Sequence, residues 1–178
     1  MSEPASLRPM SAPLFDDITS SWDMEALEVP LLVEAYRYWL SKKGDRRWPL
    51  RSSIEPTEIP RLLPFLFLIE VAQIGPPMRY RVRLVGTAFR PFFGPDITGH
   101  EVREEEVSAD RARFCSDWRE ILQRGAPRWA RIRQQVRGEQ AARDGIAAAR
   151  FTGLVLPLSR DGMAADMLLG ATVYDPVH

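Results

Sequence analysis

Alternating polar and apolar positions mark a strand near the middle of the chain. Within residues 79 to 87, the apolar side chains of Tyr80, Val82 and Leu84 alternate with arginines, and this period of two predicts a half-buried β-strand. The stretch over residues 65 to 71, apolar except at Glu70, precedes it and has the length of a buried strand. The Gly-Pro-Pro sequence between the two runs favours a turn, so we expect a β-hairpin here.

Helical spacing of apolar residues occurs in two other segments. Over residues 29 to 42 and 109 to 123 these residues recur every three or four positions, which predicts two amphipathic helices. Further strands are expected at residues 128 to 137, 147 to 158 and 165 to 174, with turn residues between them. Such an order favours one antiparallel sheet over a parallel, doubly wound one. The predicted fold class is α+β, with a single five-stranded antiparallel sheet, helices on one face and an N-terminal amphipathic helix.

Chain length and proline placement predict the domain organisation. A chain of 178 residues has the size of one domain. Residues 1 to 22 carry several prolines among small and polar residues, which is typical of a flexible arm. We expect residues 23 to 178 to form the single domain.

The expected helix over residues 29 to 42 has two interpretations. Its wide apolar face includes Leu32, Tyr36 and Trp39. That face can pack on its own domain, or part of it can pair with a second copy of the chain. Because aromatic anchors carry much of the energy in such interfaces, the second interpretation predicts a homodimer with these three residues in the contact.

Two motifs in the central region resemble those of a known family. Residues 83 to 87 read RLVGT, and residues 93 to 99 read FGPDITG. Upstream, Trp39 and the proline-rich stretch from residue 49 to 64 fit the same pattern. Together they resemble a bacterial family of short, stand-alone PAS-like proteins, and the resemblance covers roughly residues 35 to 175.

The resemblance implies a PAS-like fold and a role in sensing or protein contact. In such a fold the helical segment after the second strand covers one face of the sheet. The residues expected to face that gap, and to line any ligand pocket, are Tyr80, Val82, Leu84, Phe89, Phe92, Phe114, Cys115, Trp118 and Ile132. Either these mostly apolar side chains fill the space, or a small apolar ligand sits among them.

No haem, flavin or metal motif is recognised, so the cofactor is unknown. A photoactive flavin PAS domain places its reactive cysteine in an Asn-Cys-Arg-type stretch, whereas Cys115 follows Arg113 and Phe114. A haem-binding PAS domain uses a histidine on its long helix, and residues 109 to 123 contain none. The two histidines and single cysteine have no metal-ligand spacing.

Catalytic chemistry is not indicated either. Cys115 lies on the apolar stripe of its expected helix, where a cysteine behaves as a small hydrophobic residue. No acid–base pair and no phosphate-binding glycine loop stand out. We therefore expect that the protein is not an enzyme.

Arginines on the expected strands leave a different function open. Arg81, Arg83, Arg131 and Arg133 can share a sheet face that attracts phosphates. The formal net charge is zero, however, and base-stacking aromatics are nearly absent from those faces apart from Trp129. Ion pairing of these arginines within the chain is the favoured interpretation, and we expect no tight nucleic-acid binding.

The leading hypothesis is a non-catalytic PAS-type sensory or signal-relay domain that binds a small molecule or a signalling protein partner. The alternative is a nucleic-acid or phosphorylated-ligand binder that uses the arginine-rich sheet face. The first 18 residues lack a basic segment followed by an apolar run, and the longest apolar run is far shorter than a membrane span. We therefore expect a cytoplasmic protein with no membrane contact.

Overall fold

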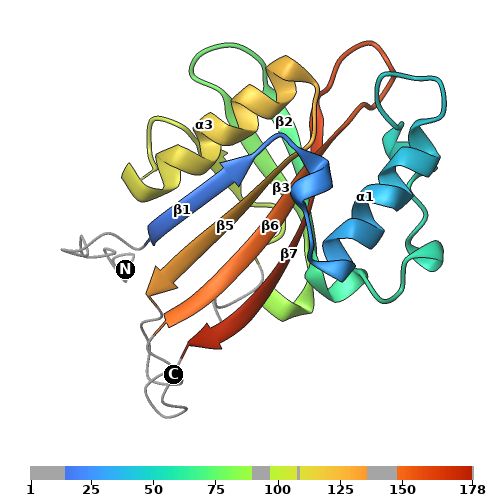
Figure 1. Cartoon of the computed structure of the whole chain (residues 1–178). Coiled ribbons are helices and arrows are strands. Elements are labelled where there is room, and N and C mark those ends of the chain that lie inside the picture. The colour runs from blue at the N-terminus through green and yellow to red at the C-terminus, as the bar shows by residue number, and fades with distance from the viewer. Residues whose placement is uncertain (1–14, 90–96, 108, 136–147, 178) are drawn as a thin grey trace.

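A seven-stranded antiparallel sheet forms the centre of the molecule (Figure 1). The computed structural model describes residues 15–89, 97–107, 109–135 and 148–177. The strands lie in the order β1-β5-β6-β7-β2-β3-β4, and every neighbouring pair is antiparallel. Their bounds are β1 Phe15–Ser21, β2 Leu66–Gln73, β3 Arg79–Val85, β4 Glu101–Arg103, β5 Arg128–Gln135, β6 Ala148–Leu158 and β7 Met167–Val177.

The expected count of five strands is wrong, because two edge strands were missed. β1 pairs with β5, so residues 15 to 21 belong to the sheet and not to a flexible arm. Its register shifts between Asp16 and Thr19, and this irregularity removes the simple alternation that predicts a strand. β4 has three residues, too few to show a period. The rest of the expected arm, residues 1 to 14, lies outside the described residues.

Helices cover both faces of the sheet, which corrects the expectation of helices on one face. Helix α1, Pro30–Lys43, packs on one face, and helix α3, Ala109–Arg124, packs on the other. We call these the α1 face and the α3 face. Successive residues of β7 alternate between them: Leu168 packs on the α3 face and Leu169 on the α1 face. Because the central strands are apolar on both sides, each face needs a helix to exclude water.

Short 3-10 helices complete the cover of the α1 face. They span Arg51–Ser53, Pro56–Glu58 and Leu63–Phe65, in the proline-rich stretch between α1 and β2. Each proline lacks a backbone N–H, so regular elements in this stretch stay short. Two further single turns lie at Met24–Ala26 and Thr87–Phe89.

Gly86, within the RLVGT motif, permits a close approach of two backbone segments. A Cβ atom at this position would lie 2.1 Å from the carbonyl oxygen of Pro64. The Gly86 N–H donates to the carbonyl of Leu66 at 2.7 Å. Because any side chain would collide with backbone atoms, only glycine fits the crossing between the end of β3 and the start of β2. Among the described helices, none has the combination of length and apolar character needed to cross a bilayer.

Candidate functional site

The space beneath α3 holds four of the nine residues expected to line a pocket. Tyr80, Val82 and Cys115 are buried there, and Trp118 packs against them. The rings of Tyr80 and Trp118 meet edge to face, with centroids 5.1 Å apart. Ile121 of α3, buried in the same cluster, was not on the expected list. These described side chains pack directly against one another.

Leu84 does not join this cluster, because a β-bulge reverses the facing of the strand. Val82 pairs with Ile69 and Leu84 pairs with Leu68, so Arg83 is an extra residue in β3. Beyond it, Val85 packs toward the α3 face and Leu84 is 38% exposed. The simple alternation that places Leu84 beside Tyr80 is therefore wrong past Arg83.

The other expected pocket residues are dispersed. Phe89 is buried, and its ring meets Phe67 edge to face at 5.9 Å. Phe114 and Ile132 are half-buried. Phe92 lies outside the described residues.

A half-buried carboxylate, that of Glu104, links β3, β4 and α3 at the margin of this cluster. Glu104 accepts hydrogen bonds from the Tyr80 hydroxyl at 3.3 Å and the Met78 N–H at 3.2 Å. It also forms an ion pair with Arg119 at 2.6 Å. Burial alone would raise the pKa of Glu104, but the hydrogen bonds from Arg119 and Met78 outweigh it and hold that pKa below its usual value. The carboxylate is therefore charged at neutral pH and fully engaged.

The two titratable groups inside the cluster are held neutral. Burial raises the pKa of Tyr80, and the nearby charge of Glu104 raises it further. Burial likewise raises the pKa of the Cys115 thiol to about 11. A thiol with that pKa is almost entirely protonated at neutral pH, and the thiolate is the nucleophilic form. Among the described residues, no group of three His, Cys, Asp or Glu side chains is placed to hold a metal ion.

Two of the three expected dimer anchors are buried within the chain itself. Leu32 is fully buried and Trp39 is 3% exposed, both against the sheet. The Trp39 indole N–H donates to the carbonyl of Pro157 in β6 at 2.8 Å. Tyr36 is half-buried and stacks on Trp39, with ring centroids 6.2 Å apart. The apolar stripe of α1 therefore packs on its own sheet, and Leu32 and Trp39 are not available to a second copy.

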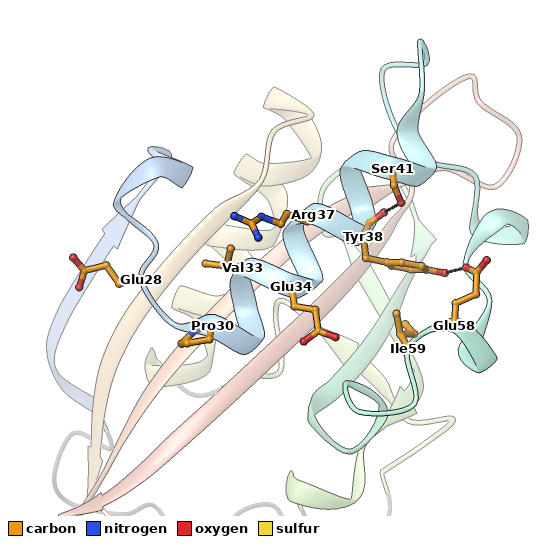
Figure 2. A pocket seen from close by; sticks show the side chains of 9 residues that line it. All are labelled: Glu28, Pro30, Val33, Glu34, Arg37, Tyr38, Ser41, Glu58 and Ile59. Atoms are coloured by element: carbon orange, nitrogen blue, oxygen red, sulfur yellow. Dashed lines mark hydrogen bonds between the residues drawn. The ribbon is translucent and has the colours of Figure 1, made fainter.

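An open groove runs along the opposite, outward side of α1 (Figure 2). Its walls come from α1, from the segment just before it and from the 3-10 helix Pro56–Glu58. The lining residues are Glu28, Pro30, Val33, Glu34, Arg37, Tyr38, Ser41, Glu58 and Ile59.

Tyr38 fixes one end of the groove. Its hydroxyl donates to Glu58 at 2.8 Å and accepts from the Glu55 N–H at 2.9 Å. Lys42 forms an ion pair with the same Glu58 carboxylate at 2.6 Å. Hydrogen bonds from Lys42 and Tyr38 lower the pKa of Glu58, and burial raises the pKa of Tyr38. Glu28 lies at the other end and Glu34 nearer the middle of the groove, and neither carboxylate forms an ion pair with any described residue.

A comparison with family models decides the identity of this fold. Residues 27–173 match the family model described as PAS domain. The chain belongs to the PAS domain family. The five inner strands, β5-β6-β7-β2-β3, provide the antiparallel sheet expected of it. No curated protein and no solved structure matched the chain.

Membership of this family makes the chain a sensory or signalling module. PAS domains are generally non-catalytic. In this PAS domain the groove was missed from the sequence, because Tyr38 and Glu58 lie twenty positions apart and meet only through the fold. The single hint was the polar character of Glu34, Arg37 and Ser41 between the buried positions of α1.

The arginines of this PAS domain do not form the single face expected from the sequence. Arg81 pairs with Glu101 at 3.1 Å, and Arg83 pairs with Glu70. Both lie on β3, whereas Arg131 and Arg133 lie on β5, with β6, β7 and β2 between them. Three intervening strands separate the two groups by roughly 20 Å. The four arginines therefore cannot act as one phosphate-binding surface.

Proposed function

We propose that this PAS domain is a non-catalytic signal-relay module that acts mainly through contact with a protein partner on its α1 face. The observation that carries the proposal is the contrast between the two faces. On the α3 face the described aromatic side chains pack on one another, and Glu104 is saturated with hydrogen bonds. On the α1 face a groove is open to solvent.

The chemistry of the groove favours a protein over a small molecule. Small-molecule sites are concave and bury most of the ligand surface. This groove lies along the outward side of α1 and combines the half-buried side chain of Val33 with the carboxylates of Glu28 and Glu34, which pair with no described residue. An elongated, partly charged surface of this kind suits a polypeptide with complementary charge.

A non-catalytic role is supported by the state of Cys115. A buried thiol with a pKa of about 11 is a poor nucleophile at neutral pH. Nucleic-acid binding, the second hypothesis, loses its main support because Arg81 and Arg83 are engaged by Glu101 and Glu70.

Replacement of Trp118 tests whether the α3 face is a packed core or a ligand pocket. If the cluster is filled, Trp118→Ala lowers the free energy of unfolding by about 3 to 5 kcal/mol, because it leaves a cavity. Trp118→Phe serves as the control, since it retains a ring against Tyr80, and its effect should be clearly smaller. Urea unfolding curves give both values.

The contrary result is a bound small molecule. Heat-denatured wild-type protein would then release a defined compound, detectable by mass spectrometry of the supernatant. Trp118→Ala would release less of it while changing stability little. That outcome would replace the proposed relay by protein contact with direct ligand sensing.

A further inference from the structure

We propose that Arg79 and Arg103 form a binding site for a phosphate group at the β3–β4 edge of the α1 face. This inference goes beyond the proposed function and does not depend on it. It follows from one arginine whose charge and hydrogen-bond donors have no partner among the described residues. We call Arg79 and Arg103 the Arg79 site.

Both side chains of the Arg79 site lie on the same face of the sheet. Their chain neighbours Tyr80 and Val102 pack in the cluster beneath α3, and successive residues of a strand point to opposite faces. Arg79 and Arg103 therefore point to the α1 face. The strand residues buried beneath α1 come from β2, β5, β6 and β7, and none of those described comes from β3 or β4. The site accordingly lies outside the area that the helix covers.

The two arginines are direct neighbours across the β3–β4 pair. Arg79 lies opposite Arg103 in the register, and opposite residues have Cβ atoms about 4.5 to 5.5 Å apart. On its other side Arg79 lies opposite Gln73 of β2, whose amide donates to the carbonyl of Pro77. Like charges placed opposite each other destabilise a sheet. Neither neighbouring strand therefore places a negative charge opposite Arg79.

The guanidinium group of Arg79 is unsatisfied within the described chain. Its side chain forms no ion pair and donates no hydrogen bond to any described residue, and its Nε atom is buried. The residue as a whole is half-buried. Nearly all buried polar groups in folded proteins have a hydrogen-bond partner, so this N–H calls for an acceptor from outside the described chain.

The carboxylates in contact with the site are already shared. Glu101, the diagonal neighbour of Arg79, pairs with Arg81 at 3.1 Å and with Arg103 at 3.4 Å. Hydrogen bonds from Arg81 and Arg103 hold the pKa of Glu101 below its usual value. Glu106 pairs with Arg103 at 3.1 Å. Arg79, Arg81 and Arg103 thus have two carboxylates between them, which leaves an excess of positive charge.

A phosphate group suits this pair of guanidinium groups. Arginine has five N–H donors, of which Arg103 donates two to its glutamates, and the Arg103 side chain is 39% exposed. A phosphate monoester offers three oxygens and a charge of about −1.5 to −2 at pH 7, so one group can bridge both arginines. A carboxylate has two oxygens, which a single arginine already matches. The ligand is therefore a phosphate group, carried by a small molecule or by a phosphorylated side chain of a protein.

A single phosphate group fits the site better than a nucleic acid does. The formal net charge of the chain is zero, so there is no overall attraction to a polyanion. Glu101, Glu105 and Glu106 lie beside the site in the chain and are exposed. Their carboxylates would repel the further phosphates of a nucleic-acid backbone.

Replacement of Arg79 tests the site. Protein dialysed into phosphate-free buffer is melted with and without inorganic phosphate, at an ionic strength held constant with potassium chloride. Arg79→Gln removes the unpaired charge. Arg61→Gln, at an exposed arginine that pairs with no described residue, is the control for the change of net charge. Because phosphate stabilises folded proteins in general, only the difference between the variants is informative.

The expected pattern has two parts. In about 50 mM phosphate, the Tm of the wild type and of Arg61→Gln should rise at least about 2 °C more than that of Arg79→Gln. Without phosphate, Arg79→Gln should be no less stable than the wild type, because it removes an unpaired charge opposite Arg103. A purely structural role for Arg79 predicts the reverse, which is a lower Tm without phosphate and an equal rise with it.

Nuclear magnetic resonance identifies the ligand. In proton–nitrogen correlation spectra, an arginine Nε–H signal that is missing from Arg79→Gln should shift saturably with inorganic phosphate. Glycerol phosphate and a short phosphoserine peptide represent the two sources of the group. The one that binds more tightly than inorganic phosphate shows whether a small molecule or a protein side chain carries it.

Four results would overturn this inference. Two are an equal rise of Tm in the wild type and in Arg79→Gln, and the absence of a saturable shift. The third is acetate that binds as tightly as phosphate, since the site would then take carboxylates. The fourth is a short DNA duplex that binds through Arg79 more tightly than the phosphoserine peptide does. None of these measurements involves Trp118 or the groove, so the phosphate site and the proposed function fail separately.

Discussion

The two faces of this sheet are stabilised by different means. Under α3, the ring of Tyr80 is surrounded by apolar side chains, and its hydroxyl contacts Glu104. Under α1, the apolar stripe of the helix packs on β6 and β7, but the groove outside it is largely polar. Largely buried charged groups are paired on both faces: Glu104 with Arg119 beside α3, and Glu70 with Arg83 and Arg160 on the α1 face. The exposed carboxylates of the groove, Glu28 and Glu34, form no ion pair with a described residue.

This difference separates a structural face from a contact face. Burying a charge without a partner is costly, so paired charges beside a packed cluster stabilise the domain. Unpaired charges at the surface contribute little to folding and are free to select a partner.

Replacement of Trp39 should have the largest effect on stability, because this side chain packs α1 against the sheet. Trp39→Ala should lower the free energy of unfolding by about 3 to 5 kcal/mol through the cavity it leaves. Trp39→Phe keeps much of the packing but leaves the Pro157 carbonyl without its donor, which costs about 1 to 3 kcal/mol. Urea unfolding measures both. A loss below 1 kcal/mol for Trp39→Ala would show that α1 is loosely held.

Removal of the Glu104 charge should lower the free energy of unfolding by an intermediate amount that depends on pH. Glu104→Gln should cost about 1 to 3 kcal/mol at pH 7, because the charged bond to Arg119 is lost. The pKa of Glu104 is lowered in the folded state, so its contribution is complete above the unfolded value of 4.5 and is lost as pH falls through the folded pKa.

Comparing the pH dependence of stability in the wild type and in Glu104→Gln isolates the contribution of this carboxylate. Wild-type stability should therefore decline below about pH 4.5 more steeply than that of Glu104→Gln. Parallel curves for the two proteins, from thermal unfolding between pH 3 and 7, would contradict the role assigned to this carboxylate.

Loss of the Tyr38 hydroxyl should have the smallest effect on stability. Tyr38→Phe removes the bonds to Glu58 and Glu55 at an exposed site and should cost at most about 1 kcal/mol. A loss comparable to that of Trp39→Ala would mean that the groove supports the fold rather than a partner. Thermal unfolding measures this loss, with Tyr36→Phe on the same helix as the control variant.

Regular periodicity made much of the fold predictable. The strand at residues 79 to 85 and the helix at 109 to 124 lie within two residues of their expected bounds. β1 and β4 were missed because an irregular register and a length of three residues leave no period to detect. The bulge at Arg83 could not be predicted either, because the alternation of polar and apolar residues continues through it. Only the pairing with β2 reveals the extra residue.

The candidate site was less predictable, because it depends on which elements cover each face of the sheet and each side of α1. The sequence shows that α1 has an apolar stripe, but not whether a sheet or a second copy covers it. Once Trp39 is seen to contact Pro157, the outward residues of α1 become the available surface. Likewise, Arg79 and Arg103 are twenty-four positions apart and become neighbours only through the β3–β4 register.

Native mass spectrometry of the purified chain shows whether the space beneath α3 holds a ligand, because a bound molecule adds its own mass to that of the protein. In a volatile buffer, we expect only protein masses that are whole multiples of 20.3 kDa, with no added small-molecule mass. An added small-molecule mass would contradict a filled core beneath α3.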